Sequence, residues 1–154
     1  MSESLAIIGN SLPAITPEML EKVLAAESRI MQAPQIDVQT EHILHGGMYA
    51  RTVRLAAHVV IVGVLLKVPT VLIVQGSTLM LAGDKWYRLD GYQVMPAQAG
   101  RKQVFVTNEE TSITMIFATS AKTVEEAEAE FTDETGKLLS RRKDGNDIVT
   151  VTGE

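Results

Sequence analysis

The sequence predicts a single mainly β domain, because its long central stretch consists of short apolar or alternating runs separated by turn residues. The chain has 154 residues, enough for one hydrophobic core and too few for two. Many short strands at this spacing indicate a barrel or a sandwich. Strands are expected at 36–40, 48–55, 59–66, 71–75, 77–81, 85–89, 93–95, 103–107 and 112–118, and turns at 45–47, 76, 82–84, 90–91 and 108–110.

The composition limits the classes of function. Hydrophobic residues make up 45% of the chain and charged residues 21%, which is typical of a compact globular protein. The formal net charge is -5, and the basic residues are scattered apart from those at 141–143, so no nucleic-acid partner is expected. The chain has no cysteine, which excludes disulfides, thiolate metal sites and a cysteine nucleophile.

The most apolar stretch, 59–74, is shorter than the roughly 20 residues that a membrane-spanning helix needs. Lys67 and Pro69 interrupt it, so it is interpreted as two buried strands, and no membrane association is expected. The first residues lack the basic segment and the uninterrupted apolar run of a secretory signal. The sequence therefore predicts assembly in the cytoplasm.

A helix is expected from Thr16 to about Met31. Thr16 supplies a hydroxyl N-cap, Pro17 fits the first helical position, and Glu18 lies near the positive end of the helix dipole. Apolar residues then recur at helical spacing, at positions 19, 20, 23, 24, 30 and 31. This stripe packs either against the protein's own sheet or against a neighbouring subunit.

A short acidic helix is expected up to Phe131, because Thr123 and Glu126 have the spacing of a capping box. Residues 124, 127 and 131 give it one apolar side. Beyond 136 a polar linker, expected to be mobile, leads to a β-prone tail at 148–152, which is either a frayed end or a strand for another subunit's sheet. The chain thus divides into an N-terminal arm and helix at 1–35, a barrel at 36–121, and a short helix and tail at 122–154.

Between Val59 and Thr107 the pattern resembles the cupin superfamily, small jelly-roll barrels with two sequence motifs. The first family motif places two histidines one residue apart, then a glutamate, then a glycine that turns a hairpin. Here Gly76 fits the closing glycine and Pro69 stands at the glutamate position. The two histidine positions hold Gly63 and Leu65.

The second family motif places a proline, a glycine and a third histidine. Here Gly91, Pro96 and Gly100 hold approximately the expected order, and Gln103 stands where the third histidine would be. A divalent ion needs imidazole or carboxylate ligands at several converging positions, and none of the four substituted positions supplies one. The resemblance therefore implies a cupin-like jelly-roll barrel with no metal, no cofactor and no catalytic residues.

The three histidines raise the alternative of a relocated metal site. His42 and His45 follow Glu41 closely, and His58 comes later. On a strand Glu41 and His45 share one face while His42 points away, which splits the cluster. We therefore expect solvated or edge-lying histidines at a turn.

Other polar residues have structural explanations. Asp84, Asp90, Glu109 and Glu110 fall at expected hairpin ends, where carboxylates accept backbone hydrogen bonds and stay hydrated. No spacing forces two carboxyl groups into one cleft for acid–base work. The chain also lacks a GxSxG elbow, a Walker loop and a GxGxxG sequence.

Neighbouring residues on strands face opposite ways. One ring of the pair Trp86 and Tyr87 is therefore expected in the core and the other exposed as a contact candidate. Arg51 and Arg54 are expected on opposite sides of their strand as separate surface charges. The basic pair at 101–102 is expected as exposed loop charge, with an acidic partner surface as the alternative.

The segment 46–51, the segment 96–102 and the acidic helix look like those of small cupin-like proteins from tailed bacteriophages. Jelly rolls of this size also serve as cement proteins on phage heads. The resemblance implies a homo-oligomer that binds a larger protein assembly such as a capsid shell. The expected function is a non-catalytic capsid decoration protein, located in the virion after assembly in the host cytoplasm.

Two other functions stay open. One is a metal-independent small-molecule-binding cupin, an isomerase or a sensor, which needs inward-facing polar side chains. The strands at 59–66 and 71–74 offer almost none, and a pocket lined by Gln75, Gln93 and Gln103 would favour it. The other is a binder that neutralises a toxin or inhibits a host protein, because small acidic proteins can act in this way.

Overall fold

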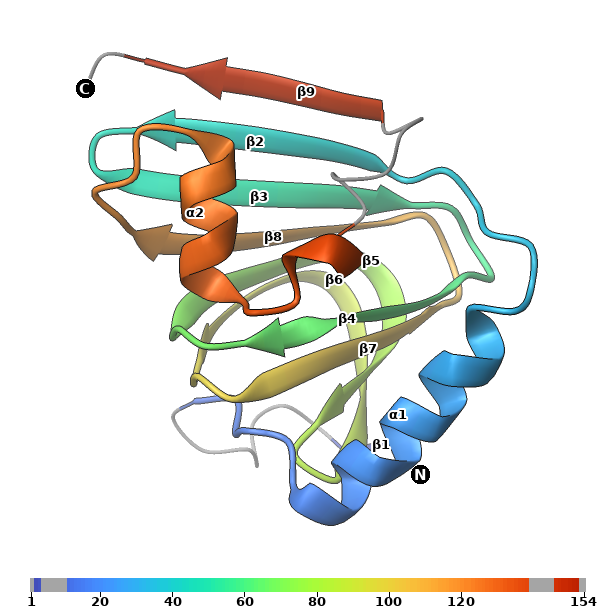
Figure 1. Ribbon diagram of the computed structural model, residues 1–154. Coiled ribbons are helices and arrows are strands. Elements are labelled where there is room, and N and C mark those ends of the chain that lie inside the picture. The colour runs from blue at the N-terminus through green and yellow to red at the C-terminus, as the bar shows by residue number, and fades with distance from the viewer. Residues whose placement is uncertain (1, 4–10, 139–145, 153–154) are drawn as a thin grey trace.

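The computed structural model describes residues 2–3, 11–138 and 146–152, and it shows a mainly β barrel with two α-helices (Figure 1). The predicted fold class, with an N-terminal helix and a short C-terminal helix, is confirmed. The helices are α1 (Pro17–Ile30), α2 (Val124–Phe131) and the short 3-10 helix η2 (Thr135–Lys137). The strands are β1 (Ser2–Glu3), β2 (Gln39–His45), β3 (Met48–Leu55), β4 (Val60–Leu66), β5 (Thr70–Ala82), β6 (Lys85–Ala97), β7 (Arg101–Thr107), β8 (Thr111–Ala118) and β9 (Asn146–Val151).

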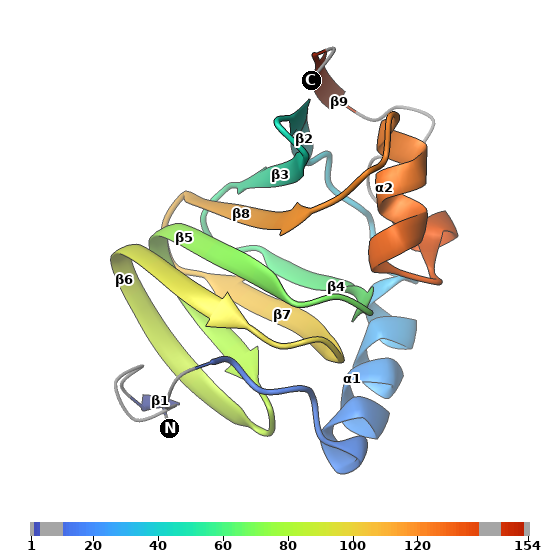
Figure 2. The ribbon, with the colours of Figure 1, turned by 90° about the vertical axis from the view of Figure 1, so that its left-hand side faces the viewer.

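One curled sheet forms the barrel. Its main path runs β1-β6-β5-β8-β3-β2-β9, and β7 pairs with both β4 and β5. The long strand β5 makes the curl possible, because its first half pairs with β8 and its second half pairs with β7. Both α-helices lie on the same side, with α2 beside β2, β3 and β8 and α1 beside β4 and β7 (Figure 2). In the part of the chain that is described, no helix combines the length and hydropathy needed to cross a bilayer.

The β2–β3 hairpin forms where the sequence predicts a turn. Its two loop residues, Gly46 and Gly47, have φ angles of +60° and +73°. A two-residue hairpin loop with positive φ at both positions matches the twist of the flanking strands, and glycine adopts it without strain. The pairing His45 with Met48 follows directly and fixes the register of the hairpin.

The turns predicted at Gly76 and at Asp90-Gly91 are wrong. Gly76 pairs with Gly91 in the middle of the β5–β6 hairpin, so the expected strands merge into two long ones. Gly76 has φ +144°, and a Cβ there would lie 2.5 Å from Thr111 Oγ1 and 2.6 Å from the Glu110 carbonyl oxygen. A glycine therefore lets β5 pass close to the start of β8, where sequence alone suggests a reversal.

The substitution Gly76→Ala is expected to destabilise the protein by roughly 2–5 kcal/mol, because it combines a strained backbone conformation with overpacking. Gly91→Ala is the matched control, since a Cβ there has nothing within 4 Å. We expect it to cost only about 1 kcal/mol, for its positive φ alone. Urea unfolding of both variants measures the difference, and equal losses would contradict the role of the close approach.

Helix α1 packs against the protein's own sheet, as one of the two alternatives states. Thr16 caps it, its Oγ1 accepting a hydrogen bond from Met19 N at 3.3 Å. Val23 is buried in a cluster with Leu81 and Val104. The rest of the apolar stripe is only partly covered. Residues 19, 20 and 30 are half-buried, while Leu24 is 43% exposed and Met31 is 61% exposed.

Helix α2 has the predicted Thr123 cap and apolar side, but the Glu126 carboxylate reaches back to the residue before the cap and not to the Thr123 amide. Glu126 N donates to Thr123 Oγ1 at 3.1 Å, and the Glu126 carboxylate accepts from Lys122 N at 3.2 Å. Ala127 and Phe131 pack in a buried cluster with Tyr49, and Val124 packs against its edge. The helix thereby covers the part of the inner sheet face that lies beside β2, β3 and β8.

The C-terminal tail forms strand β9, which pairs in parallel with β2 of the same chain. Asp147 lies beside Thr40 and Val149 beside His42. Both predicted alternatives for the tail, a frayed end and a strand that pairs with another subunit, are therefore wrong for these residues. The linker that is predicted to be mobile falls mostly on 139–145, which lie outside the described residues.

Candidate functional site

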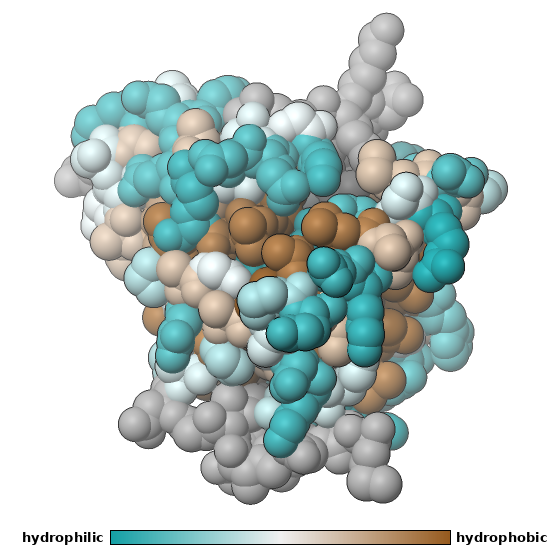
Figure 3. Space-filling view, turned by 60° about the horizontal axis from the view of Figure 1, so that its bottom comes forward, coloured by the Kyte–Doolittle hydropathy of each residue, from teal (hydrophilic) through white to brown (hydrophobic). Residues whose placement is uncertain are grey.

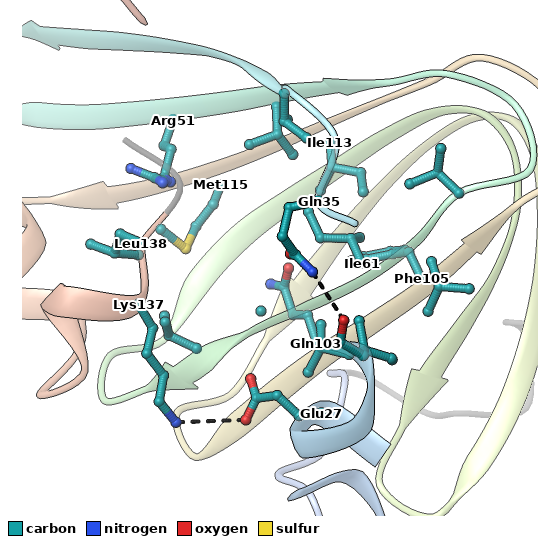
Figure 4. A pocket seen from close by; sticks show the side chains of 18 of the residues that line it. Glu27, Gln35, Arg51, Ile61, Gln103, Phe105, Ile113, Met115, Lys137 and Leu138 are labelled. Carbon is teal, nitrogen blue, oxygen red and sulfur yellow. Dashed lines mark hydrogen bonds and ion pairs between the residues drawn. The ribbon is translucent and has the colours of Figure 1, made fainter. Parts of the chain in front are cut away.

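A cavity of about 180 Å³ lies inside the barrel. Strands β3, β4, β7 and β8 supply most of its apolar wall, which includes Val53, Ile61, Phe105, Ile113 and Met115. Helix α1, the loop after it, and η2 close one side (Figure 4). The mouth is marked by lining residues that are themselves exposed, namely Met31, Ile36 and Val60. The face that carries β4, β7 and α1 shows a central band of apolar side chains between polar regions (Figure 3).

Gln103 places an amide group in this cavity (Figure 4). The pairing of β4 with β7 shifts between Val62 and Leu65, so two residues of β4 face Gln103 alone. Such a bulge re-aims side chains and interrupts the ladder locally. Gln103 Nε2 is buried and has no hydrogen-bond partner among the described residues. A buried donor without a partner is rare in folded proteins and is a candidate contact for a ligand.

Arg51 points into the cavity from β3 and is held by an ion pair. Its Nη1 lies 3.0 Å from Glu128 Oε2, with only 9% and 1% of the two side chains exposed. The guanidinium also lies 5.6 Å from the centre of the Phe131 ring, within the range of a cation–π contact. The charge of Arg51 is therefore balanced at the wall of the cavity by a carboxylate from α2.

A chain of hydrogen bonds leads from Arg51 to β9. Arg51 Nη1 donates to the Tyr49 hydroxyl at 3.4 Å, and that hydroxyl lies 2.7 Å from His42 Nδ1. His42 Nε2 lies 3.2 Å from Asp147 Oδ2. Because a carboxylate only accepts, Nε2 carries the proton of the neutral ring, and Nδ1 accepts from Tyr49. Each group in the chain thus has a defined donor or acceptor role.

Burial shifts the pKa values of two groups in this hydrogen-bonded series. It raises the pKa of Tyr49 to about 12, and it lowers the pKa of His42, with Arg51 nearby adding to the effect on the histidine. The carboxylates of Asp147 and Glu128 act in the opposite direction on the His42 pKa but do not outweigh burial. His42 therefore prefers its neutral form in the folded protein.

The stability of the protein is expected to fall as the pH drops below 6.5. The folded-state pKa of His42 lies below its usual 6.5, so the unfolded chain binds this proton more readily. The contribution is complete above pH 6.5 and is lost as the pH falls toward the folded-state pKa. Urea unfolding as a function of pH should show this loss in wild type and His58→Asn, and a smaller loss in His42→Asn. The same dependence of the free energy of unfolding on pH in all three proteins would contradict the role of His42.

Four charged side chains are paired beside the mouth of the cavity. Lys102 Nζ lies 3.2 Å from Glu27 Oε2 and 3.7 Å from Glu134 Oε1, and it donates to the Gly63 carbonyl at 2.9 Å. Lys137 Nζ lies 2.9 Å from Glu134 Oε2 and 3.6 Å from Glu27 Oε1. This cluster ties α1 to β7 and η2, and its two positive and two negative charges balance.

Two of the four residues at the cupin ligand positions line the cavity, and two do not. Gly63 and Gln103 line it, whereas Leu65 and Pro69 are outside and exposed. Of the three glutamines that a small-molecule pocket would use, Gln103 lines the cavity. Gln75 is exposed outside it, and Gln93 does not line it. The segments 59–66 and 71–74 supply no polar side chain to the cavity, but Arg51 of β3 and Gln103 of β7 both line it.

The histidines do not come together. His42 is fully buried, which corrects the expectation that it is solvated, while His45 and His58 are exposed. Within residues 2–3, 11–138 and 146–152, no three His, Asp or Glu side chains are grouped so that they could hold a metal ion.

Several charged and aromatic residues are placed differently from the prediction. Arg51 faces inward and Arg54 outward as expected, but Arg51 is buried and is no surface charge. Arg101 and Lys102 are buried at the start of β7, and burial lowers the pKa of Arg101 to about 10. Tyr87 lies in the core, as predicted for one ring of the pair. The other ring is predicted to be exposed, but Trp86 is half-buried against the cluster that contains Val23 of α1.

The predicted turn carboxylates are mostly confirmed. Asp84, Glu109 and Glu110 are exposed at the ends of hairpins. Asp90 instead lies within β6, where hydrogen bonds from Ser77 and Arg88 lower its pKa. None of the four lines the cavity.

Two buried carboxylates escaped sequence reasoning although a signal was present. Glu27 follows the buried Val23 by four residues, and Glu128 follows Val124 by four. Helical spacing therefore places both on the apolar side of their helices. An acid on the buried face of a helix predicts a buried basic partner, which Lys102 and Arg51 provide.

Comparison with known proteins finds no sequence match and a weak structural likeness. Neither a family model nor a curated protein matches the sequence. The chain is similar to the crystal structure of a cupin-2 domain containing protein from Shewanella frigidimarina NCIMB 400. That match has a TM-score of 0.43 and 17% sequence identity, and it covers 65% of this chain and 98% of the other.

Proposed function

We propose that the protein binds a small molecule inside the barrel without using a metal ion. The single observation that supports this function best is Gln103, which lines a cavity with apolar walls and whose buried Nε2 has no partner among the described residues. Small-molecule sites in proteins combine such walls with a few placed polar groups. This function is the small-molecule alternative to the capsid role.

We propose binding rather than catalysis. The ionisable side chains that line the cavity are Glu27, Arg51 and Lys137, and each is engaged in an ion pair. A general acid or base must be free to exchange its proton with a substrate. The same pairing leaves Glu27 poorly suited as a metal ligand, and the wall offers no imidazole to accompany it.

The proposal is tested by titrating the protein with benzene while recording amide and side-chain chemical shifts by NMR. We expect saturable binding of one molecule, with shifts confined to residues of the cavity wall. Ile113→Trp should abolish binding by filling the cavity, and Val53→Phe serves the same purpose if that variant does not fold. Val94→Trp, an exposed site on the outer sheet face, is the control. Failure to bind benzene and its oxygen-bearing analogue acetophenone alike, or binding that survives both filling substitutions, would contradict the function.

A second candidate, self-association, is supported by the outer face of the sheet. Cross-strand pairing places five exposed apolar side chains on this face, namely Ile43, Met48, Val71, Tyr92 and Val94. Exposed apolar patches of this kind are typical of protein contacts. The charged residues Arg54 and Glu41 on this face pair with each other, so a second copy of the acidic chain can approach it.

Light scattering after size-exclusion chromatography tests this candidate. A dimer or higher oligomer is expected for the wild type and for Leu24→Glu on α1, and a monomer for Val94→Glu. A strict monomer of wild type at high concentration would contradict it. The capsid decoration role stays a prediction from the resemblance, and copurification with assembled virions would test it.

A further inference from the structure

We infer that the ligand of the barrel cavity is an uncharged, largely apolar molecule with one hydrogen-bond-accepting oxygen, which receives a hydrogen bond from Gln103 Nε2. This inference rests on the proposed binding function and specifies the chemistry of the ligand. Three properties of the cavity carry it: its volume, the pairing of its charges, and the donor that Gln103 leaves without a partner.

The volume limits the size of the ligand. The cavity measures about 180 Å³. An engineered apolar cavity of about 150 Å³ is known to bind benzene. One ring with a short substituent therefore fits inside, whereas a sugar phosphate or a nucleotide would have to project through the mouth. Phe105, Ile113 and Met115 offer such a ring an apolar wall that needs no solvation.

The charges at the wall disfavour an ionic ligand. An anion that approached Arg51 would compete with Glu128, which already lies 3.0 Å from the guanidinium with both side chains nearly buried. A cation near Glu27 would compete in the same way with Lys102 and Lys137. In either case the incoming ion loses its hydration without gaining an unpaired partner. A neutral ligand avoids this cost.

The amide of Gln103 selects for an acceptor. Gln103 lines the cavity (Figure 4), and its Nε2 is buried in the wall without a partner among the described residues, so a turn of this side chain brings the donor to a ligand in the cavity. A ligand with a carbonyl, ether or hydroxyl oxygen satisfies this donor, and a pure hydrocarbon of the same shape leaves it unsatisfied. One neutral hydrogen bond corresponds to about a tenfold difference in affinity.

Three probes of similar shape separate these properties: acetophenone, ethylbenzene and benzoate. Calorimetric titration of the full-length protein should give the tightest binding for acetophenone, about tenfold weaker binding for ethylbenzene, and no measurable binding for benzoate. Gln103→Met keeps the side-chain length and removes the donor, so it should bring acetophenone and ethylbenzene to equal affinity. Gln75→Met, at an exposed glutamine outside the cavity, should keep the wild-type preference.

The outcomes distinguish the inference from the proposed function. Ethylbenzene binding as tightly as acetophenone in wild type, or benzoate binding more tightly than both, would overturn the inference while leaving a cavity that binds small molecules. Binding of none of the three probes, or binding that persists in Ile113→Trp, would overturn the proposed function itself. The wild-type series decides the ligand class even if Gln103→Met does not fold.

Discussion

Glu128→Leu is expected to lower the free energy of unfolding by about 3–5 kcal/mol, because it removes the carboxylate partner of a buried guanidinium. Only 9% of the Arg51 side chain is exposed, so water does not replace the lost ion pair. The substitution also takes away the group that balances Arg51 at the cavity wall. Urea-induced unfolding of wild type and variant, followed by tryptophan fluorescence, measures the loss.

The double variant Arg51→Met with Glu128→Leu distinguishes two causes of the lost stability: the uncompensated charge of Arg51 and the altered packing at position 128. Replacing both members of a buried ion pair by apolar residues is often close to neutral, so the double variant should recover most of the stability. Asp133→Leu removes a carboxylate from the exposed pair with Lys67, and a change below about 1 kcal/mol is expected there. A double variant as unstable as Glu128→Leu would show that the charge is not the cause.

Phe131→Ala is expected to cost about 3–5 kcal/mol, the usual range for removing a fully buried aromatic ring. The Phe131 ring centre lies 6.2 Å from that of Tyr49 and 6.0 Å from that of Phe117, and the residue is 1% exposed. Phe131 also lines the cavity, so the truncation should enlarge the space beside Arg51. Urea unfolding measures the stability, and titration with a larger aromatic ketone measures the gain in room.

The exposed Tyr92 provides the control for this truncation. Its side chain lies on the outer sheet face and is 62% exposed, so Tyr92→Ala should change the free energy of unfolding by less than about 1 kcal/mol. Equal losses in the two variants would contradict the assignment of Phe131 to the core that joins α2 to the sheet. An unchanged preference for small ligands in Phe131→Ala would contradict its place at the cavity wall.

Local features of the fold can be predicted from the sequence because neighbouring residues decide them. Thr16 and Thr123 cap their helices through bonds that span three residues, and Gly46 with Gly47 forms a two-residue turn. The wrong turn at Gly76 has a physical cause in a distant strand, and Gly91 pairs with Gly76 inside the same long hairpin. A glycine that makes room for Thr111 has the same local pattern as a glycine that reverses the chain.

The site was less accessible to prediction, because partners far apart in sequence build it. The motif points to Gln103, but the local sequence does not show that it lies opposite a shift in the pairing of β4 and β7, nor that its Nε2 has no partner among the described residues. From their local sequence, Arg51 and Lys102 look like surface charges. Their buried partners, Glu128 and Glu27, come from helices distant in the sequence. His42 is buried between two groups from other strands, Tyr49 of β3 and Asp147 of β9.

The most direct test of the cavity as a small-molecule site is a crystal structure of the full-length protein with acetophenone. The predicted result is one molecule inside the barrel, with its ring against Phe105 and Met115 and its oxygen accepting a hydrogen bond from Gln103 Nε2. A cavity that stays without acetophenone at a saturating concentration, or that is filled by the protein's own side chains, would contradict the proposal.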